Sequence, residues 1–296
     1  MRNPTLICFG EVLWDLLPAG KVAGGAPMNV AYHAKQLGLR SQMISRIGDD
    51  LAGSGLLGLL NSKGVSTRFI QVDPDFSTGT VNVSLDQNGT PSYAIVQPAA
   101  WDFIHPDNTM SDTVKEADAL MFGSLACRNE RSKSTLFELL EAATLRVFDV
   151  NLRPPFFSKK ILGALLGKAD IVKVDYEELH LITGFWKDYR EERAQIDFLK
   201  DKFGLEMLIV TKGSQGAACL DENGHFEQPG FRVEVTDTIG CGDAFLAAFL
   251  SKMLTGENTP SCLHFACAVG ALVAMEVGGT PTIRKSALQK ILNQKN

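Results

Sequence analysis

The chain has 296 residues, of which 45% are hydrophobic and 21% charged, and its formal net charge is −5. This composition is ordinary for a globular protein with a sizeable core and argues against a largely disordered chain. Because no cluster of lysine and arginine is present, a general nucleic-acid binder and a membrane-surface binder are also disfavoured. The length leaves both one large α/β domain and two domains open.

The N-terminal segment does not read as a signal peptide, because Glu11 and Asp15 interrupt its apolar run and no small-residue cleavage site follows. The longest uncharged segment, 258–275, opens with polar residues. Its apolar part of about 14 residues would be ~21 Å long as a helix, too short to span a bilayer, so we expect a buried core helix. The six cysteines are scattered without a CxxC pair, which indicates reduced thiols and a cytoplasmic protein.

In chain order, apolar strand-like runs alternate with helix-patterned stretches, which predicts an α/β fold with a mostly parallel sheet covered by helices on both faces. One helix is expected to begin at Pro27 and to end at Gly38. The expected strands are TLICFG (5–10), SQMISRIG (41–48), ADALMFG (117–123), LRVFDV (145–150), DIVKV (170–174) and EMLIVT (206–211).

Between Arg68 and Val96 the pattern changes to two-residue alternation. Val81, Val83 and Leu85 fall on one face of this expected strand, and a QNG turn leads to a return strand SYAIV. We interpret the region as a small β-sheet inserted into the α/β body.

Several familiar site motifs are absent. The nearest match to a phosphate-binding P-loop, GALLGKA (163–169), has the wrong spacing and ends in alanine. The turn after the first strand, FGEVLWD, lacks GxGxxG, so a redox enzyme with a dinucleotide-binding fold is disfavoured. Cys262, His264 and Cys267 lie close together in an apolar helical run, where core packing is a better interpretation than metal binding.

The stretch DTIGCGDAF (237–245) combines glycines with the start of an apolar helix. Gly240 and Gly242 allow a tight turn that directs free N–H groups and the positive end of the helix dipole at one point, an arrangement that suits a phosphate. Asp243 lies in the first turn of this helix, where its carboxylate could accept a proton from a hydroxyl. A simple helix cap is the alternative interpretation.

A second stretch, AGGAPMNVAYHAKQLG (23–38), has two glycines before a helix whose first turn carries Asn29. Asp15 lies a short distance upstream. A carboxylate, a carboxamide and exposed backbone together suit the hydroxyls of one sugar, although an isolated turn and cap would have the same pattern.

Together these stretches resemble the PfkB (ribokinase-like) family of carbohydrate kinases over nearly the whole chain. The C-terminal family pattern DTxGAGD is matched except for Cys241, which replaces a small residue. This departure predicts a thiol near the γ-phosphate and an activity sensitive to oxidants. The N-terminal pattern is matched at Gly24, Gly25, Asn29, Ala31, Gly38 and Gly48.

The resemblance implies a three-layer ribokinase-like fold as a single domain over residues 1–296, with lid strands at about 12–22 and 68–98. It implies that Asp243 is the catalytic base and that the amides of Gly240, Cys241 and Gly242 stabilise the transferred phosphoryl group. The sugar would bind at Asp15, Gly25 and Asn29, and the lid would exclude water and could form a homodimer contact.

ATP is the implied phosphate donor, with Mg²⁺ and a possible K⁺ as further cofactors. By resemblance, the nucleotide would bind at Thr211, Gly213, Gly216 and Cys267, with Lys212 where an apolar residue is usual.

The resemblance also implies two cation-associated residues. Glu178 of the family's NxxE motif would associate with Mg²⁺, through water, although Asp175 replaces the asparagine and puts the local hydrogen bonding in question. Asp237 would contribute to a monovalent cation site.

The stretches GEVLWDLLP and FDVNLRPPFF resemble the fructokinase branch, with D-fructose as the expected substrate. Arg153 in the second stretch is a candidate substrate contact, with an ion-paired surface arginine as the alternative. A 2-keto-3-deoxygluconate kinase, a ribokinase and a nucleoside kinase stay open, as does a non-catalytic sugar-binding regulator.

Overall fold

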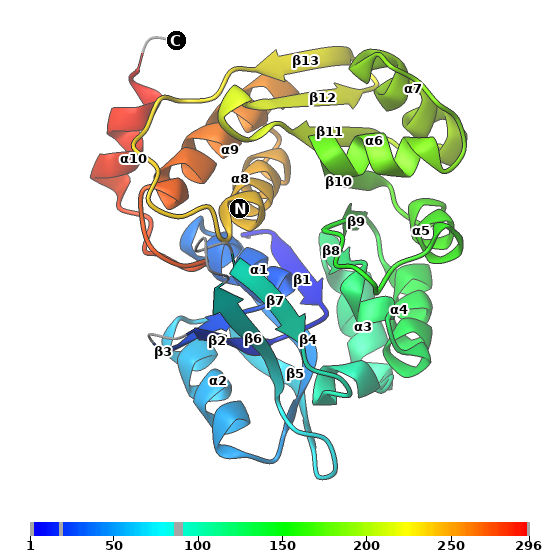
Figure 1. Ribbon diagram of the computed structural model, residues 1–296, viewed down its shortest axis with the longest axis vertical. Helices are drawn as coiled ribbons and strands as arrows, with labels where there is room; N and C mark the ends of the chain where they lie inside the picture. Colours follow the sequence, from blue (N-terminus) through cyan, green and yellow to red (C-terminus); the bar gives the residue numbers. More distant parts are fainter. Residues whose placement is uncertain (1–2, 18–19, 86–90, 295–296) are drawn as a thin grey trace.

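A computed structural model describes residues 3–17, 20–85 and 91–294, and a large sheet forms its centre (Figure 1). The strands from β11 to β5 run parallel, as the alternating pattern predicted, whereas β12 and β13 add an antiparallel edge that was not predicted. The nine described strands of this sheet follow the spatial order β13 (Gly224–Gln228), β12 (Ala217–Asp221), β11 (Met207–Thr211), β10 (Ile171–Asp175), β9 (Arg146–Asp149), β8 (Ala119–Gly123), β1 (Thr5–Phe9), β4 (Arg40–Gly48) and β5 (Ser66–Asp73).

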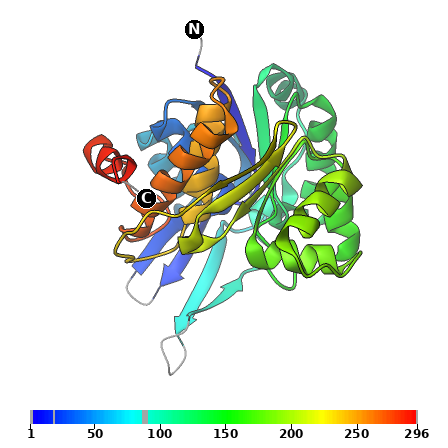
Figure 2. The same cartoon turned by 90° about the horizontal axis from the view of Figure 1, so that it is seen from above.

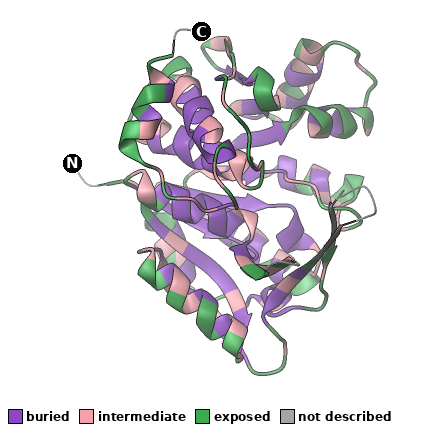
Figure 3. Ribbon diagram, turned by 60° about the vertical axis from the view of Figure 1, so that its left-hand side comes forward, coloured by how far each residue is buried: buried purple, intermediate pink, exposed green. Residues whose placement is uncertain are grey.

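Helices cover both faces of the large sheet, so the fold has three layers (Figure 2). The central strands are buried on both sides (Figure 3): Leu6 and Cys8 face one helical layer, and Ile7 and Phe9 face the other. One layer comprises α1 (Ala26–Gln36), α2 (Leu51–Ser62), α8 (Cys241–Met253), α9 (Thr259–Ala274) and α10 (Lys285–Leu292). The other comprises α3 (Asn108–Glu116), α4 (Glu130–Ala142), α5 (Lys159–Leu166), α6 (Tyr176–Gly184) and α7 (Glu192–Phe203).

The two helices predicted in detail are confirmed. α1 has Pro27 in its first turn, and Gly38 just after it has a φ of 96°, which favours glycine. α9 is a buried core helix, capped by a hydrogen bond of 2.9 Å from the Ser261 amide to the Asn258 side chain. Cys262 and Cys267 pack in the core, and the six cysteines are free thiols.

A second, smaller sheet lies beside the large one and crosses the front of the molecule in Figure 1. Val81 and Leu13 form its small buried cluster, and the QNG turn and Asp86 lie outside the described residues. Its described strands follow the order β3 (Gly20–Gly24), β2 (Leu13–Leu17), β6 (Gly79–Leu85) and β7 (Pro91–Ile95), with β2 and β6 parallel and the other pairs antiparallel.

The lid range predicted to begin at about residue 68 is wrong at its start. Residues 66–73 form β5, which pairs with β4 at the edge of the large sheet. An edge strand is covered unevenly, and β5 combines the buried Phe69 and Ile70 with the half-exposed Val72. This is the pattern that resembles a strand of a small two-sided sheet.

None of the described helices is long and apolar enough to cross a membrane.

Candidate active site

A cleft of about 1740 Å³ lies at the carboxyl ends of the parallel strands and reaches the small sheet. Apart from Asp237, the predicted site residues line this one cleft, although they come from segments far apart in the chain. Crevices at this end of parallel strands are the usual ligand sites of α/β folds. The lining includes Asp15, Gly25, Asn29, Arg153, Glu178, Thr211, Gly213, Gly216, Gly240, Cys241, Gly242, Asp243 and Cys267.

The N-terminus of α8 forms one wall of the cleft. Gly240 precedes the helix with φ 74°, and a Cβ there would lie 2.6 Å from the Gly279 backbone, so only glycine fits. The Cys241 amide donates to the Thr238 carbonyl at 3.3 Å, whereas the described residues give the amides of Gly242 and Asp243 no backbone acceptor. The turn therefore leaves free N–H groups at the positive end of the helix dipole, which suits an anion.

The Asp243 carboxylate is held in the cleft by α1. Its Oδ2 accepts a hydrogen bond of 2.8 Å from Asn29 Nδ2. Burial raises the pKa of the Asp243 carboxyl to about 6, and the charge of Asp149 adds to the rise. The Asn29 hydrogen bond and the charges of Lys173 and Arg153 limit it. At neutral pH the group is ionised and more basic than an ordinary carboxylate, as a general base should be.

The turn between β3 and α1 brings glycine backbone close to the Asp15 carboxylate and to the Glu11 backbone carbonyl. A Cβ on Gly24 would lie 2.3 Å from Asp15 Oδ2, and a Cβ on Gly25, which has φ 112°, would lie 2.4 Å from the Glu11 carbonyl oxygen. Burial raises the pKa of Asp15 to about 6, and Arg153 opposes this rise. The Asp15 carboxylate and the backbone of this glycine turn thus lie beside Asn29 and offer hydrogen-bonding groups to a ligand.

Glu11 was not among the predicted site residues. It is buried, its Oε1 accepts from the Ala26 amide at 3.2 Å, and its Oε2 has no hydrogen-bond partner among the described residues. Burial raises the pKa of Glu11 to about 7. The residue lines the cleft near Arg153 and Asp243, whose charges both affect it.

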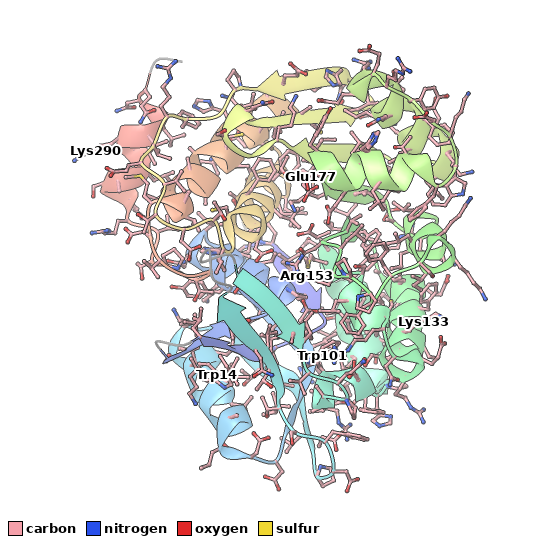
Figure 4. All side chains as sticks on the ribbon, viewed as in Figure 1. Trp14, Trp101, Lys133, Arg153, Glu177 and Lys290 are labelled. Atoms are coloured by element: carbon pink, nitrogen blue, oxygen red, sulfur yellow. The ribbon has the colours of Figure 1, made fainter. Side chains whose placement is uncertain are left out.

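Arg153 projects from the loop after β9 and lies near the centre of the molecule, between the small sheet and α6 (Figure 4). Its side chain is exposed and donates to the carbonyl of the neighbouring Leu152 at 2.9 Å. The part of the chain that the structure describes contains no ion pair of Arg153. The described residues therefore give no support to the alternative of an ion-paired surface arginine.

The opposite end of the cleft is formed by the turn after β11. Gly213 and Gly216 have φ of 55° and 97°, and a Cβ on Gly216 would lie 2.0 Å from the Gln228 carbonyl oxygen. Lys212, directly before Gly213, forms ion pairs with Glu192 at 3.1 Å and Glu227 at 3.4 Å. These ion pairs balance the Lys212 charge at the edge of the cleft, where an apolar residue was expected.

Thr211 and Cys267 complete this end of the cleft. Thr211 ends β11, and its hydroxyl donates to the Val174 carbonyl at 3.4 Å. Cys267 is a buried residue of α9.

Asp175 and Glu178 form a capping box at the start of α6. The Glu178 amide donates to Asp175 Oδ1 at 2.8 Å, and the Asp175 amide donates to Glu178 Oε2 at 2.9 Å. The replacement of asparagine by Asp175 therefore leaves the hydrogen bonding intact. Glu178 Oε1 also accepts from the Leu152 amide at 2.6 Å, so both oxygens are occupied by backbone donors. This fits an association with a hydrated Mg²⁺ better than direct coordination.

Asp237 lies outside the cleft lining. Its Oδ1 accepts from the Ile239 amide at 3.0 Å and its Oδ2 from the Gly278 amide at 2.9 Å. The carboxylate therefore connects two loops beside the start of α8. Among the described residues there is no group of three or more His, Cys, Asp or Glu side chains arranged to hold a metal ion.

The oxidant sensitivity expected of Cys241 finds no support in its surroundings. Burial raises the pKa of its thiol to about 11, and the charges of Asp237 and Asp243 add to the rise. Since the thiolate is the reactive form, this thiol is less reactive than a free cysteine at neutral pH.

Lys173 and Asp149 were also missed by the sequence analysis. Lys173 Nζ donates to Asp149 Oδ1 at 2.8 Å, and both side chains are buried next to Asp243. A usable signal was present, because IVKV and VFDV each place one charged residue among apolar residues.

The comparisons with known proteins agree with this geometry. Residues 9–285 match the model of the pfkB family carbohydrate kinases. Fructokinase-2 of Solanum habrochaites is 29% identical over 307 aligned residues, covering 94% of this chain and 92% of that protein. A Xylella fastidiosa fructokinase with bound ATP superposes with a TM-score of 0.85 at 27% identity, covering 97% of this chain and 98% of the other.

A Vibrio cholerae O395 fructokinase bound to fructose, ADP and calcium superposes with a TM-score of 0.86 at 26% identity, covering 98% of this chain and 99% of the other. The large mostly parallel sheet with a separate smaller sheet is thus the predicted ribokinase-like fold. The chain belongs to the pfkB family of carbohydrate kinases and is a sugar kinase.

Proposed function

We propose that the chain is an ATP-dependent fructokinase, which transfers the γ-phosphoryl group of ATP to the primary hydroxyl of D-fructose. The products are D-fructose 6-phosphate and ADP. The observation that carries the proposal is the Asp243 carboxylate, fixed by Asn29 at 2.8 Å and placed beside the free amides of the α8 N-terminus. A base next to an anion site is what phosphoryl transfer to a hydroxyl requires.

In the proposed reaction, Asp243 accepts the proton of the sugar hydroxyl while the hydroxyl oxygen forms a bond to the γ-phosphorus. The bond from that phosphorus to the β,γ-bridging oxygen breaks, and ADP leaves with the electron pair. The free amides at Gly242 and Asp243 donate to the phosphoryl oxygens, where negative charge is greatest. Asp243 then releases its proton to solvent.

Mg²⁺, when bound with ATP, supplies charge neutralisation on the phosphates. Glu178 lines the cleft with a carboxylate that its backbone donors hold in place, so it would hold the ion through water. Asp237 would support K⁺ only indirectly, since both of its oxygens already accept from backbone amides.

The charges of the sugar end favour a neutral sugar. Glu11, Asp15 and Asp243 all line this end of the cleft, where Arg153 acts on all three and Lys173 acts on Asp243. A carboxylate substrate such as 2-keto-3-deoxygluconate would meet three acidic groups, which disfavours it by like-charge repulsion. Hydroxyl groups can instead donate to these carboxylates. This argument supports fructose over an acidic sugar.

We also propose that the small sheet is a lid over the sugar. Leu13, Val81 and Ile95 of this sheet line the cleft with apolar side chains. Such a cover would exclude water from the transferring phosphoryl group and would disfavour hydrolysis of ATP.

The test is ATP consumption with Mg²⁺ and K⁺ in the presence of fructose, ribose, 2-keto-3-deoxygluconate, adenosine or tagatose, compared by kcat/KM. We expect fructose to exceed the others by at least about tenfold, which corresponds to about 1.4 kcal/mol. Preference for another sugar would overturn the fructokinase assignment and retain the phosphoryl-transfer mechanism. If none is phosphorylated while a sugar still binds, the non-catalytic regulator becomes the better description.

A further inference from the structure

Lys173 is a charged residue in the middle of a buried strand. Its neighbours in β10, Val172 and Val174, are fully buried, and Lys173 itself is only 6% exposed. Lysine is almost never this buried without a specific partner, because removing an ammonium group from water is costly. Its presence in the centre of the sheet therefore calls for an explanation.

One partner of Lys173 is Asp149 at the end of the adjacent strand β9. Lys173 Nζ donates to Asp149 Oδ1 at 2.8 Å. An ammonium group has three N–H donors, and Asp149 is the only hydrogen-bond acceptor that the described residues provide for it. Asp149 Oδ2 is also buried and lacks a partner among these residues. The pair thus retains hydrogen-bonding capacity at a buried site.

The free side of the ammonium group faces the proposed phosphate site. A Cβ on Gly242 would lie 3.3 Å from Lys173 Nζ, which puts the charge against the first turn of α8. The free amides of this turn belong to Gly242 and Asp243. A strand and a helix that are far apart in the chain thus bring three N–H groups, one ammonium and two backbone amides, to the same part of the cleft.

The surroundings keep Lys173 charged. Burial lowers its pKa, but the charge of Asp149 and then those of Glu178 and Asp243 outweigh this effect and raise it. Lys173 is therefore an ammonium ion at neutral pH. It is also a cation close to the carboxylates of Asp149 and Asp243, at a point where negative charge on a phosphoryl group needs compensation.

We propose that Lys173 is a further catalytic residue, which donates a hydrogen bond to the γ-phosphoryl group as that group passes from ATP to the sugar and ADP is released. Asp149 is the positioning residue that holds the ammonium group against Gly242. The inference rests on the proposed kinase function. Its alternative is that Lys173 only neutralises Asp149.

The experiment uses ADP, aluminium fluoride and D-fructose, which together mimic the transferring phosphoryl group. We expect Lys173→Met to lower kcat by about 100-fold or more and to weaken binding of the complete mimic by a similar factor. The dissociation constants of ADP alone and fructose alone should change by less than about threefold. Lys168→Met, which removes an exposed lysine paired with Glu141, is the matched control and should behave like the wild type.

The double variant Asp149→Asn/Lys173→Met separates the two roles, because it removes both buried charges and leaves neither unpaired. We expect it to bind the mimic as weakly as Lys173→Met, while Asp149→Asn alone loses less. Recovery of wild-type binding and kcat in the double variant would overturn the proposal. If the wild type phosphorylates no sugar, the kinase proposal itself fails; if it does and Lys173→Met is equally active, only the role of Lys173 fails.

Discussion

Asp243 is the residue on which the proposed chemistry depends. In Asp243→Asn the amide keeps the size of the side chain but cannot accept the proton of the sugar hydroxyl. We expect kcat to fall by about 10²–10⁴-fold, the usual contribution of a general base, while fructose and ATP still bind. Asp201→Asn, an exposed carboxylate on α7, is the control. Steady-state kinetics would measure the loss of kcat, and calorimetry would show whether fructose and ATP still bind. Near-normal turnover in Asp243→Asn would refute the role of Asp243 as the base.

The same substitution should stabilise the fold. The pKa of Asp243 is about 6 in the folded chain, whereas an unfolded aspartate titrates near 3.9. The folded state therefore binds this proton more tightly, and its stability falls as the pH rises from about 4 through about 6. Removing the charge in Asp243→Asn relieves this loss.

We expect Asp243→Asn to melt about 2–4 °C higher than the wild type at pH 8, with the difference shrinking towards pH 4. Thermal melts across this range would measure it. A Tm difference that is independent of pH would show that the carboxylate is not destabilised by its burial.

At the scale of elements, the start of α8 depends on one backbone conformation. Gly240→Ala introduces a Cβ 2.6 Å from the Gly279 backbone and also strains a residue with φ 74°. We expect the turn to shift and kcat/KM to fall by about 100-fold, because phosphoryl transfer is sensitive to displacements of about 1 Å. Gly204→Ala is the matched control, because it has a similar φ of 65° but open space around it. Equal activities of the two variants in the coupled kinase assay would contradict this account.

Local signals explain which elements could be predicted from the sequence. The turn at Gly240 and the start of α1 at Pro27 need particular residue types, so their position was readable from DTIGCGDAF and AGGAPMN. β5 was assigned to the lid because an edge strand and a strand of a small sheet share the same uneven exposure. The two kinds of strand differ in the strands with which they pair, and pairing partners cannot be read from a single sequence.

Side-chain partners were the least predictable part of the site. Lys173 meets Asp149 across two neighbouring strands, and Glu11 lies against the start of α1 only after the chain has folded. Their unusual feature in the sequence is a charge within an apolar run, which signals burial but does not identify the partner. The resemblance to a kinase family assigned no role to Lys173, Asp149 or Glu11.

For the molecule as a whole, one face of the small sheet lines the cleft, and this arrangement is the basis of the proposed lid. β2 presents Asp15 and Leu13 to the cleft from one face, and Leu16 lies on the other face with 37% of its surface exposed. Val81 of the neighbouring strand β6 joins the cleft-lining face. Removing apolar cover from that face should admit water to the phosphoryl site without altering the base.

We therefore expect Val81→Ala to raise the KM for the sugar several-fold and to increase the ATP hydrolysed per sugar phosphate formed, because binding of the sugar closes a less apolar lid. Leu16→Ala makes a comparable truncation on the opposite face of the same sheet and should leave both quantities unchanged. Parallel measurement of ADP and sugar phosphate gives the ratio directly. If the ratio rises equally in both variants, the small sheet acts through its general stability, and a face-specific water barrier is ruled out.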